Sequence, residues 1–340
     1  EKHLMSDVPV GLFLSGGYDS TAIAYYLEQL HYNSQAFSVG FPGWKGSEHQ
    51  FARIVAEKFS HKHNELMATE EDYGLLEKLM FHYDDPIADI SIIPTFLVSR
   101  FASEKVKTVL SGEGADEIFG GYSWYKTGVR QPYKQSVYDS GQRMLKGIRP
   151  FSTEHYAEAM AMGMFGKKTL REMLGTDIRI PEDPFHFYRK TEPEGITGVK
   201  AFQFRDIRSF MGELVLTKVD RASMANSLEV RVPFLDHRIA EFVLRLDENI
   251  YHKKNITKFL LHENIKDKVP AEILKRPKQG FTGPDSFYGN FNLYREILND
   301  SVLVSDQYIQ KEFVISALQR KDKWRLWKLA VMETWYRKWK

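Results

Sequence analysis

Apolar and polar positions in the first third of the chain alternate between short strand-like runs and longer helix-like runs. Val10 to Leu14 are mostly apolar and predict a buried strand, and the run opened by Asp19 has the apolar density of a helix. Further strands are expected over Gln35–Val39, His63–Met67 and Lys107–Leu110, and helices over Ser47–Phe59, Glu70–Phe81 and Pro94–Glu104. This alternation predicts an α/β fold with a parallel sheet flanked by helices.

Strand signals fade after Tyr122, and the rest of the chain is expected to be mainly helical. Helices are predicted over Glu154–Met164, Phe202–Met224 and Arg238–Leu246. The polar and basic stretch from Gly128 to Ser152 is more typical of a solvated loop or exposed helix face than of a binding patch. We therefore expect an α/β core over residues 1–125 and a mainly helical part over residues 126–340 that completes the same functional domain.

The amino-acid composition argues against several classes of protein. The 340 residues include 47 Lys and Arg against 45 Asp and Glu, a net charge of +2 without the clustered basic excess of a nucleic-acid-binding protein. No apolar run approaches the ~18 residues of a membrane span, so no membrane partner is expected. The absence of cysteine from the sequence excludes disulfides, thiolate metal sites and cysteine nucleophiles within it. A cytoplasmic location is the default expectation.

The first predicted strand is followed by small and polar residues. They are Ser15, Gly16, Gly17, Tyr18, Asp19 and Ser20. Small residues let backbone N–H groups approach a phosphate, and the dipole of the following helix favours its negative charge. Asp19 would repel phosphate unless a cation lay between them, which suggests Mg²⁺. The alternative is a tight turn in which Asp19 only caps the helix.

A second loop of the same kind follows the predicted strand Lys107–Leu110. Residues 111–122 read SGEGADEIFGGY, with three carboxylates close together. Gly112 and Gly114 flank Glu113, so a ligand could approach the backbone closely and Glu113 would be placed as a general base. The alternative is that the carboxylates only cap and begin a helix.

These two segments resemble those of a known enzyme family. SGGYDS is similar to the PP-loop of ATP pyrophosphatases, and together with SGEGADEIFGGY it resembles the synthetase domain of glutamine-hydrolysing, B-type asparagine synthetases. Lys218–Asp236 and Arg276–Phe281 (RPKQGF) resemble two further family segments in the same order. The resemblance runs from about Ser6 to at least Phe281. It implies a PP-loop fold of the adenine nucleotide alpha hydrolase type.

The resemblance implies a two-step reaction that uses ATP and Mg²⁺. The side-chain carboxylate of aspartate attacks the α-phosphate, giving β-aspartyl-AMP and pyrophosphate, and ammonia then displaces AMP to give asparagine. Residues implied to bind ATP or its pyrophosphate portion are Leu14, Ser15, Gly16, Gly17, Asp19, Ser20, Val39, Ser111 and Gly112. Leu14 and Val39 are expected to contact the adenosine.

The resemblance also assigns chemistry to four other positions. Glu113 matches the catalytic glutamate, and Lys278 matches the lysine that neutralises charge on the α-phosphate. Asp116 matches a carboxylate that binds substrate or metal, so Asp19 and Asp116 are the candidate Mg²⁺ ligands. Arg221 is a further candidate for substrate binding, although an ion pair within its helix is the simpler account.

Complete family members begin with a glutaminase domain whose N-terminal cysteine releases ammonia. This chain contains neither that domain nor any cysteine. We expect it to use free ammonia, or ammonia from a glutaminase domain or subunit that lies outside it. Two other functions stay open: amidation of a different carboxylate, such as that of a sugar acid, and nucleotide binding without catalysis.

Aromatic residues recur at helical spacing near the end of the chain. Trp324, Trp327, Val331 and Trp335 share one face of a predicted helix. Such a stripe usually packs into a core. A membrane-surface or partner-binding helix is the alternative, because the other face is rich in Lys and Arg.

Overall fold

The computed structural model describes residues 1–128, 151–161, 165–180, 186–251, 253, 256–276 and 279–340. The chain divides into two compact units, which we describe separately. Unit 1 contains Glu1–Gly112, Leu216–Pro233 and Ile265–Lys340, and unit 2 contains Glu113–Val215 and Phe234–Asn264. The predicted boundary at residue 125 falls within unit 2, and the division into two consecutive parts stays a prediction.

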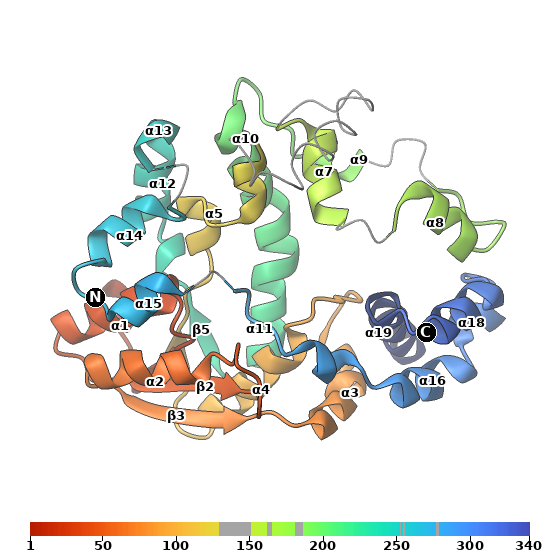
Figure 1. The fold of residues 1–340 in the computed structure, drawn as a ribbon, viewed down its shortest axis with the longest axis horizontal. Coiled ribbons are helices and arrows are strands. Elements are labelled where there is room, and N and C mark those ends of the chain that lie inside the picture. The colour runs from red at the N-terminus through yellow and green to blue at the C-terminus, as the bar shows by residue number, and fades with distance from the viewer. Residues whose placement is uncertain (129–150, 162–164, 181–185, 252, 254–255, 277–278) are drawn as a thin grey trace. The chain divides into compact units, whose positions relative to one another are not determined.

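A five-stranded parallel sheet forms the centre of unit 1. Its strands are β1 (Val10–Phe13), β2 (Gln35–Gly40), β3 (Lys62–Met67), β4 (Thr108–Leu110) and β5 (Glu229–Arg231) (Figure 1). Their order across the sheet is β3-β2-β1-β4-β5. The predicted parallel sheet flanked by helices is confirmed. The sequence did not predict β5, because its three residues at the sheet edge show no run of apolar residues.

Two pairs of helices cover this sheet. They are α1 (Tyr18–Gln29) with α2 (His49–Lys58), and α4 (Ile92–Ser103) with α11 (Thr217–Met224). The members of each pair pack on each other and on strands of the sheet. Because parallel crossovers are right-handed, the connections that run from β1 towards β3 and those that run towards β5 place their helices on opposite faces. The strands therefore lie in a buried layer, where Leu12, Phe37 and Val109 are fully buried.

The remaining elements of unit 1 are short or lie near the end of the chain. They are η1 (Lys2–Leu4), η2 (Glu70–Leu75), α3 (Leu76–His82), α15 (Ala271–Lys275), η6 (Asp285–Tyr288), α16 (Phe291–Asn299), α17 (Val302–Ser305), α18 (Lys311–Gln319) and α19 (Lys323–Trp339). The single helix predicted over Glu70–Phe81 is thus a 3₁₀ turn followed by a helix.

The C-terminal helix α19 packs into unit 1. Trp327 is 1% exposed and Val331 is fully buried. The indole N–H of Trp327 donates to the carbonyl of Ala88 at 2.9 Å, and that of Trp335 donates to the carbonyl of Tyr83 at 3.2 Å. The core interpretation of the aromatic stripe is confirmed for Trp327 and Val331.

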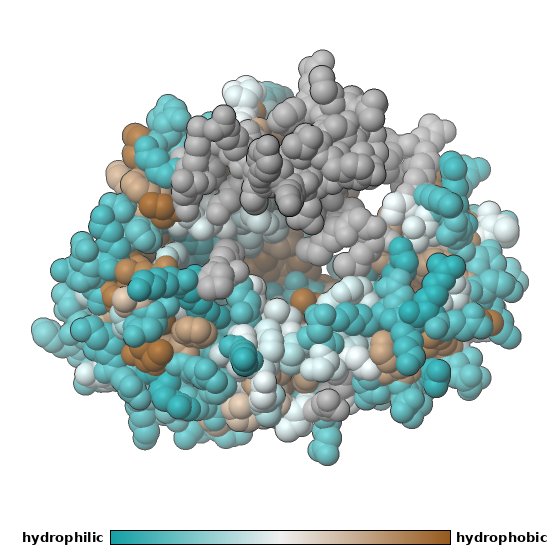
Figure 2. All heavy atoms as spheres, in the orientation of Figure 1, coloured by the Kyte–Doolittle hydropathy of each residue, from teal (hydrophilic) through white to brown (hydrophobic). Residues whose placement is uncertain are grey.

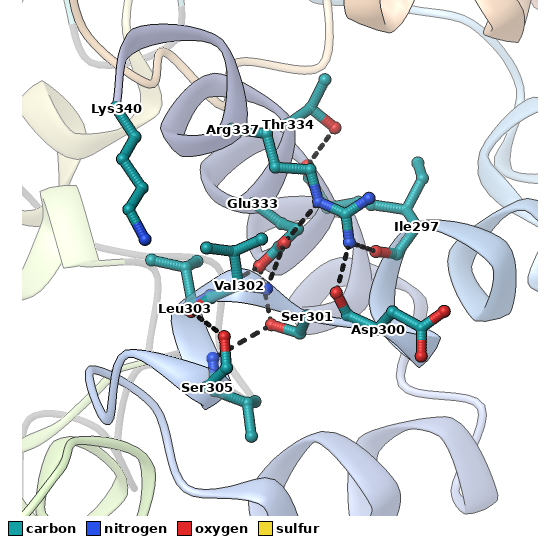
Figure 3. A network of polar contacts seen from close by, with 12 residues as sticks. Ile297, Asp300, Ser301, Val302, Leu303, Ser305, Glu333, Thr334, Arg337 and Lys340 are labelled. Atoms are coloured by element: carbon teal, nitrogen blue, oxygen red, sulfur yellow. Dashed lines mark hydrogen bonds and ion pairs between the residues drawn. The ribbon is translucent and has the colours of Figure 1, made fainter.

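Glu333, on the same helix, is the centre of the polar network shown in Figure 3. Its carboxylate is fully buried and accepts hydrogen bonds from the Ser301 hydroxyl at 2.6 Å and the Val302 N–H at 2.7 Å. Arg337 donates to it at 2.6 Å and also to the carbonyl of Asp300 at 2.8 Å. The network satisfies backbone N–H groups at the start of α17 and ties that helix to α19.

Unit 2 is built mostly of short helices. They are α5 (Ala115–Phe119), η3 (Ser123–Gly128), α7 (Thr153–Ala161), α8 (Lys167–Met173), α9 (His186–Arg189), α10 (Gly198–Asp206), η4 (Ile207–Leu216), η5 (Pro233–Leu235), α12 (His237–Arg245), α13 (Glu248–Tyr251) and α14 (Phe259–Ile265). Three of the four unit boundaries fall within η4, η5 and α14, and the fourth lies between Gly112 and Glu113. The helix predicted over Phe202–Met224 is observed as α10, the π-helical η4 and α11 in succession. Most of the basic stretch from Gly128 to Ser152 lies outside the described residues.

Asp206 organises the aromatic core of unit 2. It is fully buried and accepts hydrogen bonds from the indole of Trp124 at 3.0 Å and from the hydroxyls of Tyr125 and Tyr156. Burial raises the pKa of Asp206 to about 6, although these three donors favour its ionised form. Because one carboxylate accepts from all three donors, it holds these aromatic side chains in fixed relative positions.

Hydrophilic residues cover most of the described surface on the face shown in Figure 2, as the sequence composition suggests. Among the described helices, none combines the length and the apolar character that crossing a lipid bilayer requires.

Candidate active site

The strand order places the two predicted loops at neighbouring positions. From β1 the chain moves outward to β2 and β3, and it then returns to form β4 on the other side of β1. Leu12 of β1 is paired with Leu110 of β4, so both strands end at the same edge. Ligands of open parallel sheets bind at such a reversal point, outside the carboxyl ends of the strands. The loops after β1 and β4 therefore occupy the expected ligand-binding position of unit 1.

Hydroxyl groups hold the loop after β1 in a compact turn. The Gly17 N–H donates to the Ser15 hydroxyl at 3.2 Å, and the Ser15 N–H donates to the Ser20 hydroxyl at 3.2 Å. Gly16 has a φ of +69°, in the left-handed region that favours glycine. The turn leads into α1, whose first residues include Asp19. This is the strand–turn–helix arrangement expected of an anion-binding loop.

Gly112 brings the loop after β4 against the start of α1. A Cβ atom at Gly112 would lie 2.8 Å from the Cβ of Asp19 and 3.2 Å from the backbone nitrogen of Ser20. The preceding residue, Ser111, is buried and donates its N–H to the carbonyl of Arg231 at 2.8 Å, which continues the pairing with β5. The structure thus brings together the predicted residues of both loops as far as Gly112.

Leu14 and Val39 lie at the carboxyl ends of β1 and β2, as predicted. Each is 2% exposed. The Leu14 N–H donates to the Phe37 carbonyl at 2.9 Å, which extends the sheet by one residue. Because their side chains are packed in the core, contact with an adenosine would fall largely to their backbone atoms.

Glu113 follows Gly112 directly and is the first residue of unit 2. It is half-buried, and its Oε2 atom is buried with no hydrogen-bond partner among the described residues. Gly114 has a φ of +85°, and a Cβ there would lie 2.2 Å from Leu235. A side chain at position 114 would therefore displace the turn that sets the direction of Glu113.

Asp116, on α5, forms an ion pair that the sequence did not predict. Its Oδ1 atom lies 3.1 Å from the Nζ atom of Lys258, a residue that is only 4% exposed. A Cβ at Gly121 would lie 1.9 Å from the same carboxylate oxygen and 2.3 Å from Lys258 Cε. Only glycine fits beside this pair. Lys258 is distant in sequence from residues 111–122, so no local pattern could have indicated the contact.

Gln203 holds the carbonyl end of α5. Its side-chain amide donates to the carbonyls of Glu117 at 2.8 Å and Ile118 at 3.1 Å, and it accepts from the Tyr251 hydroxyl at 2.7 Å. Gln203 is fully buried. It satisfies carbonyls that a helix end leaves without partners. Sequence reasoning missed it, because a lone glutamine in a helical run carries no distinguishing signal.

Glu117 is a second buried carboxylate in this loop. It is 1% exposed and accepts a hydrogen bond from the Tyr122 hydroxyl at 2.7 Å. Burial raises its pKa to about 7, and the negative charge of Asp116 adds to the effect. Glu117 is therefore protonated over part of the neutral pH range, unlike an ordinary surface glutamate.

Arg221 and Lys218, both on α11, pair with carboxylates distant in sequence. Arg221 forms an ion pair with Asp84, and Lys218 lies 3.5 Å from Asp89. Burial alone would raise the pKa of Asp89, but the charge of Lys218 and hydrogen bonds from Ser91 outweigh burial and lower it. These pairs tie α11 to the segment after α3, and Arg221 also lies 3.5 Å from Asp220 within its own helix, as the simpler interpretation assumed.

The arrangement of carboxylate side chains can be compared with what a magnesium ion requires. Across the described residues, no group of three or more His, Cys, Asp or Glu side chains is arranged to hold a metal ion. Mg²⁺ is usually bound by one or two carboxylates together with substrate phosphates, so Asp19 beside the predicted phosphate-binding loop fits that chemistry. Asp116 is paired with the cation of Lys258, so it fits less well.

Lys278 lies outside the described residues, although its neighbours Arg276 and Gln279 are described. A cavity of about 410 Å³ lies among residues 286–295 and Lys321 and is lined by none of the predicted site residues.

Comparisons with known proteins identify the family. The family model described as "Asparagine synthase" matches residues 1–337. Asparagine synthetase [glutamine-hydrolyzing] 1 of Bacillus subtilis is 32% identical over 98% of this chain and 57% of its own length. A putative asparagine synthetase [glutamine-hydrolyzing] 2 of Methanocaldococcus jannaschii is 40% identical over 68% of this chain and 48% of its own length.

More distant similarities are also found. The asparagine synthetase [glutamine-hydrolyzing] of Cricetulus griseus is 26% identical over 94% of this chain and 46% of its own length. A solved structure described as a "predicted subunit of tRNA methyltransferase" from Methanocaldococcus jannaschii covers 49% of this chain and 77% of its own, at 20% identity. Its TM-score of 0.24 is too low to inform on function. The chain spans about half the length of the curated relatives it matches. Because the family model spans nearly all of its residues, the chain belongs to the asparagine synthase family.

Proposed function

We propose that this chain is the synthetase part of an ATP-dependent ligase that converts aspartate and ammonia to asparagine. One observation carries the proposal beyond family membership: Gly112 brings the loop after β4 into contact with Asp19 at the start of α1. Two loops that the sequence predicts to bind ATP thus meet at one point of the sheet, and Glu113 follows directly. Because the chain spans about half of its relatives' length, the reaction is a proposal for this chain.

The first step would transfer AMP to aspartate. A side-chain carboxylate oxygen of aspartate attacks the α-phosphorus of ATP, and the bond to the bridging oxygen of the β-phosphate breaks to release pyrophosphate. Backbone N–H groups and hydroxyls of residues 15–20 would bind the departing pyrophosphate. Lys278 would neutralise charge on the α-phosphate. Mg²⁺ held by Asp19 and phosphate oxygens would lower the repulsion between the phosphates.

The second step would form the amide. The nitrogen of ammonia attacks the carbonyl carbon of β-aspartyl-AMP, and the bond from that carbon to the AMP oxygen breaks. The attacking nitrogen becomes positively charged, and the Glu113 carboxylate stabilises this charge and accepts one proton. The buried Oε2 of Glu113, which has no described partner, supports this role. Asp116 and Arg221 are candidates for binding aspartate, and each would exchange its present ion pair for the substrate.

Substitution of Glu113 separates the two steps. The chain is incubated with ATP, Mg²⁺, aspartate and ammonium, and pyrophosphate and asparagine are measured separately. For Glu113→Ala, aspartate-dependent pyrophosphate release should largely survive while asparagine formation falls by about 10²-fold to 10⁴-fold, the usual contribution of a general base. Glu104→Ala, at an exposed carboxylate that follows α4, is the matched control and should behave as the wild type.

Two results would contradict the proposal. Pyrophosphate release by the wild type that ignores aspartate, but responds to another carboxylate such as a sugar acid, would change the substrate. Loss of both steps in Glu113→Ala with an unchanged unfolding midpoint would remove the assignment of Glu113 to the second step.

A further inference from the structure

Arg276 is a buried cation that the roles assigned above do not use. Its side chain is 7% exposed. The Nη2 atom donates to the Glu48 carboxylate at 2.8 Å, and the Nη1 atom donates to the carbonyl oxygen of Ser15 at 3.0 Å. The guanidinium also lies over the ring of Phe51, 4.4 Å from its centroid. All of these residues belong to unit 1. These contacts hold the guanidinium group of Arg276 in one orientation, because its planar shape fixes the directions of both hydrogen bonds at once.

The contact with Ser15 determines the direction of a peptide group in the phosphate-binding loop. The bond between Ser15 and Gly16 is trans. In a trans peptide, the carbonyl and the following N–H point in opposite directions. Because the Ser15 carbonyl accepts from Arg276, the N–H of Gly16 points away from the guanidinium. Arg276 therefore decides which way one backbone donor of this loop faces.

Gly16 is held against the same surface that supports Arg276. A Cβ at Gly16 would lie 2.5 Å from the Cβ of Phe51 and 2.8 Å from the backbone nitrogen of Ala52. Phe51 thus touches the loop at Gly16 and also supports the guanidinium, and Glu48 precedes the same helix. The start of α2, Arg276 and the loop form one packed cluster. Rotating the Ser15–Gly16 peptide would break the Arg276 contact, and the backbone at Gly16 already lies close against α2.

We propose that Arg276, held by Glu48 and Phe51, is a positioning residue that presents the Gly16 N–H to the pyrophosphate portion of ATP. The inference rests on the proposed function for the identity of the ligand. A fixed donor lowers the cost of binding, because the loop does not have to order itself around the anion. Arg276 touches the loop and need not touch the ligand. Its effect should fall on the phosphates and spare the adenosine.

A paired substitution separates positioning from stability. Arg276→Met alone removes the donor to Ser15 but leaves Glu48 buried without its cation, which is strongly destabilising. Arg276→Met with Glu48→Leu replaces the whole pair by apolar groups of similar size, and such replacements often restore stability. Trp327→Ala, far along the chain on α19, is the control for lost stability alone. Each variant is titrated with inorganic pyrophosphate, ATP and AMP in the presence of Mg²⁺, and its thermal midpoint is measured.

The double variant should regain a midpoint near that of the wild type yet bind pyrophosphate and ATP about 10-fold to 100-fold more weakly, the loss expected for a hydrogen bond involving a charged group. Its affinity for AMP should stay near that of the wild type. Wild-type affinity for pyrophosphate in the double variant, or an equal loss for AMP, would overturn the inference. A wild-type chain that binds neither ATP nor pyrophosphate would instead refute the proposed function, and the inference with it. A wild-type chain that binds both ligands but makes no asparagine would leave the inference standing.

Discussion

At the scale of single residues, the candidate site depends on positions where only a small side chain fits. Gly112 touches Asp19, Gly114 touches Leu235, and Gly121 lies beside the ion pair of Asp116 with Lys258. In each case a Cβ would come closer to another residue than packing allows. The two glycines that flank Glu113, Gly112 and Gly114, predicted close approach of a ligand. The structure shows a second reason for these glycines, which is close approach of the protein to itself.

Substitution of Gly112 tests whether its contact with Asp19 requires glycine at this position. In Gly112→Ala the new methyl group would lie 2.8 Å from Asp19 Cβ, so the loop after β4 and the start of α1 must separate. We expect a loss of about 1–3 kcal/mol in the free energy of unfolding, and weaker ATP binding because Asp19 shifts. Denaturant unfolding and equilibrium titration with ATP measure the two effects. Gly74→Ala, where the new atom would meet nothing within 4 Å, is the matched control. Unchanged ATP affinity in Gly112→Ala would show that the contact does not place Asp19.

At the scale of elements, the short helix α5 is held by residues from several parts of unit 2. Gln203 satisfies its carbonyl end, and Lys258 neutralises Asp116. Helices of five residues are not stable alone, so these contacts supply what local hydrogen bonding lacks. The buried carboxyl group of Glu117, by contrast, destabilises this region when it is ionised. Its charge has no full compensation and becomes costly as the pH rises.

This balance makes the stability of the chain depend on pH in a defined direction. Burial raises the pKa of Glu117 from 4.5 in the unfolded chain to about 7. The folded chain therefore binds more protons than the unfolded chain between these values, and stability falls as the pH rises through about 7. Glu117→Gln, which matches the neutral acid in size, should flatten the fall in unfolding free energy between about pH 4.5 and 7 by roughly 3 kcal/mol. Urea unfolding across this range measures it. Glu77→Gln, at an exposed site, should leave the slope unchanged, and an unaltered slope in Glu117→Gln would refute the assignment.

At the scale of the whole molecule, unit 1 is assembled from three separate stretches of chain. The sheet needs β5 from the second stretch. Arg276 and α19 come from the third, and α19 packs on α3 of the first. A unit assembled in this way cannot be separated from the rest of the chain at one point in the sequence. The consecutive division suggested by fading strand signals therefore differs from the compact units observed.

The contribution of α19 to stability can be measured at Trp327 and Trp339. Trp327 is 1% exposed and bonded to the carbonyl of Ala88, so Trp327→Ala should cost about 3–5 kcal/mol of unfolding free energy. Trp339, on the same helix, is 51% exposed, and Trp339→Ala should cost much less. Denaturant unfolding followed by tryptophan fluorescence and by circular dichroism measures both. Equal losses in the two variants would show that burial of the stripe is not what joins α19 to unit 1.

The local hydrophobic pattern by itself determined the first four strands, most helices of the first third, and the two glycine-containing loops. It did so because strand and helix periodicity and turn chemistry are properties of neighbouring residues. The motifs also placed the chain in its family. The residues of both loops stay predictions for catalysis and binding, since their roles depend on ligands rather than on the chain's own packing.

Only the tertiary structure decided which strands are neighbours, that β5 completes the sheet, and which distant residues support the loops. Arg276 and Glu48 meet across 228 positions of sequence, and Gln203 reaches Glu117 across 86. Each of these side chains is unremarkable in its local context. A buried charge or amide takes its meaning from the partners that folding brings to it, and those partners are set by the packing of the whole chain.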